Sequence, residues 1–365
     1  MTRPAAFAIP GDIQTRTGGY IYERRLLETL PMVGQPMRHV PLLPSWPHPT
    51  PEAEADLARA LAALPEGMPL ILDGLVFGAM ATDLLARQPR AVVAMLHHPL
   101  GLETGLPPAR AAALLAREAA NLRHAAHVVV PSAHTRDILM REFSVAGDEI
   151  TVALPGFDRP HSTPRPKAAP PLILSVGLIC ARKGHDVLLD ALARLAHLDW
   201  RAAIVGLTHD ETVRQSLLHQ RARLGLETRL RFTGEIAPGA LDRLYRQATV
   251  FALASRYEGY GMVLSEAQLY GLPVVSCAVG AVPQTVPEGA GLLVPPEDAK
   301  AFAGALDRML TDDALRMRLS ERSAAVGRAL PGWQETARVM RDVLARVEPM
   351  PGGGVDVQPH EGETP

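Results

Sequence analysis

Short apolar runs alternate with helical patterns through the first half of the chain. Three runs predict buried strands that end in polar or glycine-containing loops: LILDGL (70–75), RAVVAMLHH (90–98) and HVVVPS (127–132). Helical periodicity predicts helices around them, over 18–30, 51–64, 76–87 and 108–123. Strands that alternate with helices predict a parallel sheet covered on both faces. Ligands bind such sheets at the carboxyl ends of the strands, where His97, His98 and Ser132 lie.

The same pattern restarts after a proline-rich segment, 159–171, whose composition is typical of a connection between domains. Further strands are predicted over 171–179, 201–207, 230–236, 250–255, 273–277 and 290–296. The chain is therefore expected to be an α/β protein with two Rossmann-like parallel-sheet domains facing a central cleft. We place the N-terminal domain at 1–165 and the C-terminal domain at 171–330.

The C-terminal region contains one more helix and a tail. Residues 331–346 predict an amphipathic helix that begins after Pro331. Residues 349–365 are rich in proline and glycine, are acidic and have almost nothing to bury, so we expect them to be disordered.

Composition narrows the function classes. Of 365 residues, 47% are apolar and 21% charged, which is typical of a globular protein. The net charge of −2 argues against a nucleic-acid partner. The chain has two cysteines, no convincing signal peptide and no apolar stretch near the roughly 18 residues that a membrane span needs. We therefore expect a cytoplasmic protein, and peripheral contact with the inner face of the membrane stays open. The arginine and alanine bias suggests a bacterial source.

The stretch RYEGYGMVLSEAQLYGLPVVSC (256–277) carries the strongest chemical signal. A predicted strand is followed by a glycine loop and then a helix, so bare backbone amides meet a helix N-terminus, which is a site for anions. Glu258 lies in the loop and Glu266 in the helix, eight positions later. A carboxylate is a good acceptor for sugar hydroxyls. The alternative is that the two glutamates are solvated or cap the helix.

Lys183 follows another predicted strand, within the segment LILSVGLICARKGHDVLLDALARL (172–195). A helix begins just after it, so its ammonium group would lie where a phosphate is the natural partner. The chain has only two other lysines, Lys167 and Lys300, which favours this role over that of an ordinary solvated cation.

Three further positions in the first half are candidates. Gly18 and Gly19 open a helix, although they do not match a dinucleotide fingerprint. His97 ends a strand and is expected to face the cleft, with His98 more outward. Asp73 also ends a strand and suits either an acceptor-binding or a structural role. No Asp-x-Asp pair or His/Cys cluster with ligand spacing is present, so we expect no cofactor and no metal.

Together these stretches resemble a known family. SRYEGYGMVLSEAQLYGLPVVSCAVGAVPQTVPEGAGLLVPPED (255–298), SVGLICARKGHDVLLDAL (175–192) and TGGYIYERRLLETL (17–30) are similar to the family 4 (group 1) retaining glycosyltransferases of the GT-B fold. The resemblance extends to about residue 345. It implies transfer of a hexose-type sugar from a nucleotide-diphosphate donor to an acceptor hydroxyl, without a metal and through a same-face mechanism that the leaving phosphate assists.

The resemblance also implies roles for individual residues. Lys183 would neutralise the donor diphosphate with help from Arg182, Glu258 would bind the sugar, Glu266 the ribose, and His97 would line the sugar side as a third catalytic residue. The helix 331–346 would pack back onto an acceptor-side N-terminal domain. The remaining implied donor contacts are Gly18, Gly19, Gly259, Tyr260, Gly261, Met262 and Val263, with Asp73 and His98 toward an unidentified acceptor.

One position departs from the family pattern, and other functions share the fold. Many members have an arginine directly after the glycine of the first C-domain strand, where this chain has Leu178, so Arg182 would have to substitute. The alternatives are a GT-B sugar phosphorylase, a nucleotide-sugar epimerase, and a non-catalytic binding subunit.

Overall fold

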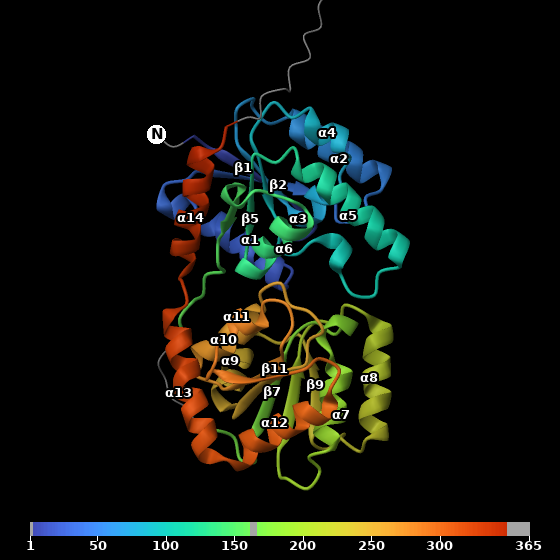
Figure 1. The fold of residues 1–365 in the computed structure, drawn as a ribbon, viewed down its shortest axis with the longest axis vertical. Coiled ribbons are helices and arrows are strands. Elements are labelled where there is room, and N and C mark those ends of the chain that lie inside the picture. Colours follow the sequence, from blue (N-terminus) through green and yellow to red (C-terminus); the bar gives the residue numbers. More distant parts are fainter. Residues whose placement is uncertain (1–2, 161–165, 349–365) are drawn as a thin grey trace, which may run out of the picture.

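The structure is a computed structural model that describes residues 3–160 and 166–348. Two α/β units are stacked along the long axis, with the N-terminal half at the top of Figure 1 and the C-terminal half below it. Each contains a six-stranded sheet whose neighbouring strands are all parallel. The expectation of two parallel-sheet domains is therefore confirmed. The predicted disordered tail, 349–365, lies outside the described residues.

The N-terminal sheet has the strand order β2-β1-β3-β4-β5-β6. Its strands are β1 (Ala5–Pro10), β2 (Met37–Leu42), β3 (Leu70–Asp73), β4 (Val92–Met95), β5 (His127–Val130) and β6 (Ile150–Val152). Its helices are α1 (Gly18–Thr29), α2 (Pro51–Ala62), α3 (Gly74–Phe77), α4 (Thr82–Ala86), α5 (Pro108–Leu122) and α6 (Ala133–Glu142), with short 3-10 turns η1 (Pro31–Val33), η2 (Leu100–Leu102) and η3 (Gly147–Glu149). Every residue of β3 and β4 is buried, which explains why both are continuous apolar runs.

The C-terminal sheet has the order β12-β11-β10-β7-β8-β9. Its strands are β7 (Leu172–Val176), β8 (Arg201–Val205), β9 (Leu230–Gly234), β10 (Val250–Leu253), β11 (Val274–Cys277) and β12 (Gly291–Val294). The helical elements are η4 (Ala181–Lys183), α7 (His185–Ala193), α8 (Glu211–Arg223), α9 (Pro238–Gln247), α10 (Met262–Leu269), α11 (Val282–Thr285), α12 (Ala299–Thr311) and α13 (Asp313–Ala329). Apolar clusters cover both faces of this sheet.

Helix α14 (Trp333–Arg346) returns from the C-terminal half to the N-terminal one, and Figure 1 shows it beside α1. Its buried side chains, Trp333 and Met340 among them, join the core cluster that contains Phe7 and Ile9 of β1. The chain crosses tightly there, because a Cβ on Gly156 would lie 2.4 Å from the Trp333 Cα. Each large apolar side chain buried in this way contributes roughly 1.5–3 kcal/mol to the stability of the fold. The packing of α14 therefore stabilises the connection between the two halves.

One predicted element is wrong in its extent. A single helix was expected over 76–87, but the structure has two short helices, α3 and α4, on either side of Gly78. Helix α3 begins directly after β3 because the Asp73 carboxylate accepts a hydrogen bond from the Leu75 amide. A Cβ at Gly78 would lie 2.7 Å from the Leu100 side chain, because the loop after β4 packs directly on Gly78. The chain turns at this contact, between the two helices.

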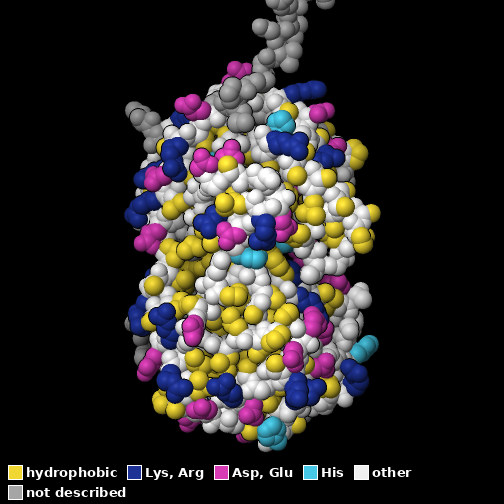
Figure 2. Space-filling view, viewed as in Figure 1, with side chains coloured by type: hydrophobic (Ala, Val, Ile, Leu, Met, Phe, Trp, Pro, Cys, Tyr) yellow, Lys and Arg dark blue, Asp and Glu magenta, His cyan; other side chains and the backbone are white. Residues whose placement is uncertain are grey.

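Charge is mixed over the face in Figure 2, where acidic and basic side chains alternate. No helix within the described residues is long and apolar enough to cross a membrane.

Glu118 is a fully buried carboxyl group under the loop that follows β4. One of its oxygens accepts a hydrogen bond from the Leu100 amide, and burial raises its pKa to about 8. The folded protein therefore keeps a proton on Glu118 that the unfolded chain loses near pH 4.5. Stability from this group is present below pH 4.5 and is lost as the pH rises to about 8.

We expect Glu118→Gln to remove this pH dependence. The difference between the unfolding free energies of the variant and the wild type should increase in favour of the variant by a few kcal/mol from pH 5 to pH 8. The reason is that the amide keeps the hydrogen bond to Leu100 but never ionises. Urea denaturation at both pH values measures this, with the exposed Glu321→Gln as the matched control. An equal difference at the two pH values would contradict the assignment.

Candidate functional site

Two glycine turns from different domains face each other between the two halves. Gly18 opens α1, and a Cβ at that position would lie 3.6 Å from the Met262 sulfur at the start of α10. A Cβ on Gly19 would lie 3.4 Å from the His97 ring, and a Cβ on Gly259 would lie 2.6 Å from the His97 carbonyl oxygen. The structure thus brings together five residues that the sequence predicted separately. The three glycines among them have no side chain, which permits the close approach.

Polar contacts hold the glycine loop of the C-terminal domain against the N-terminal domain. The Ser132 hydroxyl donates a 2.6 Å hydrogen bond to the Gly259 carbonyl oxygen. The His134 amide donates to the Gln284 side chain. At the edge of the same interface, Arg16 forms an ion pair with Glu235 at 3.2 Å. The described structure is therefore one in which the two domains are in contact around the loop.

A buried ion pair lies at the base of this loop. Lys183 Nζ is 2.6 Å from Glu258 Oε1, and both residues are less than 10% exposed. The same oxygen accepts a hydrogen bond from the Ser255 hydroxyl, and Arg182 approaches Oε2 at 3.7 Å. Burial alone would raise the pKa of Glu258, but the charges of Lys183 and Arg182 outweigh it and lower the pKa, so the carboxylate is ionised.

Local backbone geometry explains how Lys183 reaches that position. The turn η4 ends at Gly184, whose φ is +59°, and a Cβ there would lie 1.9 Å from the Ala254 carbonyl oxygen. Only glycine fits a left-handed turn pressed this closely on the end of β10. The aliphatic part of Lys183 packs over Gly177, where a Cβ would be 3.4 Å from it. Of the two adjacent residues, Lys183 supplies the charge and Gly184 meets the packing requirement.

Arg182 points into the same region from the other side of the loop. Its Nε lies 3.0 Å from a Glu103 oxygen of the N-terminal domain, and it donates to the Tyr257 carbonyl oxygen at 3.2 Å. Burial would lower the pKa of Arg182, but Glu258 and Glu103 together raise it. The Leu178 backbone carbonyl oxygen accepts a hydrogen bond from the His185 ring. Arg182 thus places a guanidinium beside Glu258.

The predicted residues at the start of α10 and within it form a second group. The Tyr260 carbonyl oxygen accepts from the Thr285 hydroxyl, and Gly261 caps α10 with a φ of +83°. Val263 packs against the core of the sheet. Glu266 accepts a 2.8 Å hydrogen bond from the Tyr245 hydroxyl of α9, and burial raises its pKa. Glu266 is therefore half-buried and hydrogen-bonded within the domain.

His98 differs from the expectation that it would point outward. Its ring lies 4.4 Å from the Tyr257 ring of the other domain, and both ring nitrogens are buried. Burial lowers the pKa of His98 to about 4, with Arg182 acting in the same direction. A neutral imidazole packed on an aromatic ring closes the interface at this point. The sequence could not show this because Tyr257 is far away along the chain.

A buried carboxyl that the sequence analysis missed lies behind His97. Glu23 on α1 is 1% exposed, and its Oε1 is 3.4 Å from His97 Nε2. The Asp73 carboxyl group, which is 4% exposed, lies close to that of Glu23, with an oxygen of each within 4.8 Å of the other. Atoms of Glu23, Asp73 and His97 lie close enough to one another to hold a metal ion. In the sequence Glu23 looks like one of several polar residues on an ordinary surface helix.

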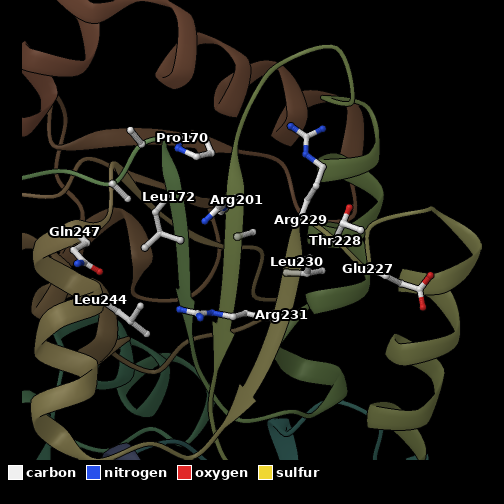
Figure 3. Close-up of a pocket in the computed structure, with 13 residues that line it drawn as sticks. Pro170, Leu172, Arg201, Glu227, Thr228, Arg229, Leu230, Arg231, Leu244 and Gln247 are labelled. Carbon is white, nitrogen blue, oxygen red and sulfur yellow. The ribbon is translucent and has the colours of Figure 1, made fainter.

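A hollow in the C-terminal domain lies away from these residues. It has a volume of about 320 Å³ and contains three arginines, as Figure 3 shows: Arg201, Arg229 and Arg231. Leu172, Arg201 and Leu230 are the first residues of their strands, so the hollow lies at the amino ends. Ligands of parallel sheets bind at the opposite, carboxyl ends. We therefore place the candidate site at the interface of the glycine turns.

Comparison with known proteins finds relatives that match part of this chain. A family model described as "Glycosyl transferases group 1" matches residues 159–326. The chain is 34% identical over 238 residues to a D-inositol 3-phosphate glycosyltransferase of Corynebacterium aurimucosum, which is 60% of this chain and 56% of that protein. It is 33% identical over 243 residues to one of Frankia alni, covering 61% and 59%. The chain thus matches less than two thirds of the length of these relatives.

Solved structures match over nearly the whole chain. Sucrose-phosphate synthase from Thermosynechococcus elongatus superposes with a TM-score of 0.79 at 24% identity, covering 93% of this chain and 98% of that one. The Anabaena HepE protein in complex with UDP-glucose superposes with a TM-score of 0.74 at 17% identity, covering 94% and 100%. At these identities the likeness concerns the fold.

We expect Gly259→Ala to disturb the contact between the domains rather than either domain alone. The new Cβ would lie 2.6 Å from the His97 carbonyl oxygen, so the loop or the neighbouring domain has to move. Small-angle scattering should show a larger radius of gyration than for the wild type. Gly304→Ala on α12, with nothing within 4 Å of the new Cβ, is the control and should leave the radius unchanged. Equal radii for all three proteins would contradict the role of Gly259.

Proposed function

We propose that this chain, which has the GT-B fold, is a group 1 glycosyltransferase that moves a hexose-type sugar from a nucleoside-diphosphate donor to an acceptor hydroxyl. The observation that carries this proposal is the cluster of Lys183, Arg182 and Glu258 beside a glycine loop that leads into a helix N-terminus. Cations and free amides suit a diphosphate, and a carboxylate suits the attached sugar.

The donor diphosphate would bind at the start of α10. The amides from Gly259 to Val263 and the positive end of the helix provide hydrogen bonds to an anion, and Lys183 and Arg182 supply charge. In the structure both cations are paired with carboxylates, Lys183 with Glu258 and Arg182 with Glu103. A bound diphosphate would share or replace these partners. The HepE structure in complex with UDP-glucose supports this class of donor.

The sugar would be held by the free side of Glu258. Its Oε1 already accepts from Lys183 and Ser255, whereas the cation nearest to Oε2 within the described residues is Arg182, at 3.7 Å. Oε2 is therefore the oxygen that can accept hydrogen bonds from sugar hydroxyls. The Lys183 contact keeps the carboxylate ionised and fixes its orientation before the donor arrives. Glu266 would bind the ribose, and His97 would line the sugar side.

The reaction would proceed with retention and without a metal. Breaking the anomeric bond leaves an oxocarbenium-like sugar and adds negative charge to the diphosphate. Lys183, Arg182 and the α10 amides stabilise that charge more in the transition state than before it. The leaving phosphate oxygen then takes the proton of the acceptor hydroxyl as the acceptor attacks on the same face.

The acceptor would enter from the N-terminal domain, near His97 and Asp73. The relatives from Corynebacterium and Frankia are named for D-inositol 3-phosphate, which supports a polyhydroxyl acceptor for this chain as well. Contact of the protein with the membrane face remains a prediction. A phosphorylase would instead consume inorganic phosphate, an epimerase would release a free epimer, and a binding subunit would hold the donor without turnover, so product analysis separates these alternatives.

Lys183→Ala should slow transfer roughly 10- to 150-fold, because it removes one charge-assisted hydrogen bond of about 1.5–3 kcal/mol to the leaving group. Release of nucleoside diphosphate from a panel of nucleotide sugars, with EDTA present, measures the rate. The control is Lys300→Ala, an exposed lysine on α12 that should behave as wild type. Wild-type turnover by Lys183→Ala would refute the role of Lys183, and loss of all turnover in EDTA would refute metal independence.

A further inference from the structure

Glu23 and Asp73 form a buried carboxyl pair on the N-terminal side of the proposed site. Both are less than 5% exposed, and an oxygen of one lies within 4.8 Å of an oxygen of the other. Within the described residues no lysine or arginine forms an ion pair with either of them. Two carboxylates in contact without a cation repel strongly, so the pair holds at least one proton between its oxygens. Burial raises the pKa of both groups, which agrees with this arrangement.

The remaining oxygen of this pair faces His97. Glu23 Oε1 and His97 Nε2 are both buried, and neither has a hydrogen-bond partner in the described structure. They lie 3.4 Å apart. Each is therefore the available partner of the other, and a small shift would close a hydrogen bond between them.

The rest of the surroundings fixes the ring in this orientation. The Tyr22 ring meets the His97 ring edge-on at 5.3 Å, and the Tyr22 hydroxyl is occupied by the Ala153 carbonyl oxygen. Gly19 leaves space beside the ring, since a Cβ there would lie 3.4 Å from His97 Cδ2. Helix α1 thus supplies the glycine, the tyrosine and the carboxylate that surround one imidazole. The side chain of His97 is still 27% exposed.

We propose that Glu23 and Asp73 are positioning residues that hold His97 as the Nε2–H tautomer, so that its Nδ1 accepts a hydrogen bond from a substrate hydroxyl in the cleft. When one ring nitrogen of a neutral histidine donates to a carboxylate, the other is an acceptor. Asp73 keeps the shared proton and is itself fixed by the Leu75 amide. This proposal rests on the proposed function for the identity of the substrate, but the tautomer itself does not.

The hydroxyl could belong to the donor sugar or to the acceptor. Both present the same chemistry to Nδ1. Kinetics with each substrate varied in turn distinguish them, because the loss in kcat/KM appears with the substrate whose hydroxyl makes the contact.

The tautomer is tested directly by ¹⁵N-detected imidazole NMR of the full chain, with the His97 signals identified by their loss in His97→Asn. The wild type should show the Nε2–H tautomer. Glu23→Gln retains an acceptor oxygen and should retain that tautomer, whereas Glu23→Met should lose it. Glu28→Gln, an exposed residue of the same helix, is the control. An Nδ1–H tautomer in the wild type, or an unchanged spectrum in Glu23→Met, would overturn the proposal whether or not the protein is a transferase.

A double-mutant cycle separates positioning from simple packing. Glu23→Met should lower kcat/KM about 10- to 100-fold, Glu23→Gln should restore most of it, and Glu23→Met should cost nothing further in a His97→Ala background. Equal losses in both backgrounds would mean that Glu23 acts only through the fold. A stoichiometric divalent cation in the purified protein that Glu23→Gln removes would also overturn the proposal, since the charge would then be met by a metal instead of a proton.

Discussion

A buried carboxylate needs a compensating charge, and this requirement organises the centre of the molecule. Glu258 is almost fully removed from water, and its charge is tolerable only because Lys183 and Arg182 lie beside it. That pairing determines where the turn after β7 and the loop after β10 must end relative to each other. Gly184, which has no Cβ, allows them to come so close. The same contacts therefore satisfy the buried charge of Glu258 and determine how the two loops of the C-terminal domain pack.

The N-terminal domain also buries carboxyl groups, and there we propose that a proton, in place of a cation, compensates the charge. Glu23 and Asp73 have no lysine or arginine partner within the described chain, and burial raises the pKa of both. The two carboxyl clusters lie on opposite sides of the contact between His97 and the glycine loop. One favours a fixed negative charge near a proposed diphosphate site, and the other favours a neutral imidazole near the proposed hydroxyl groups. The difference follows from which cations each fold can bring close.

The sequence was sufficient for the architecture and for the main cluster. Runs such as LILD and VVAM are buried on both faces, so a continuous apolar run is enough to predict each of these strands. The spacing of glycines around Glu258 predicts the anion site. Edge strands were harder to predict: in β2 only Val40 and Leu42 are buried, and the strand contains Pro41, so it lacks a continuous apolar run. Glu23 escaped notice because its burial depends on His97 and Asp73, more than forty residues away. Long-range partners of a polar residue leave no local pattern.

The claim that the diphosphate site lies between η4 and α10 is tested most directly by hydrogen–deuterium exchange of the full chain with a nucleoside diphosphate in EDTA. The account predicts slower exchange of the amides at 181–184 and 259–263, together with the facing turn at 18–19. Protection confined to the hollow around Arg201, Arg229 and Arg231, or no protection at these three segments under saturating ligand, would contradict it.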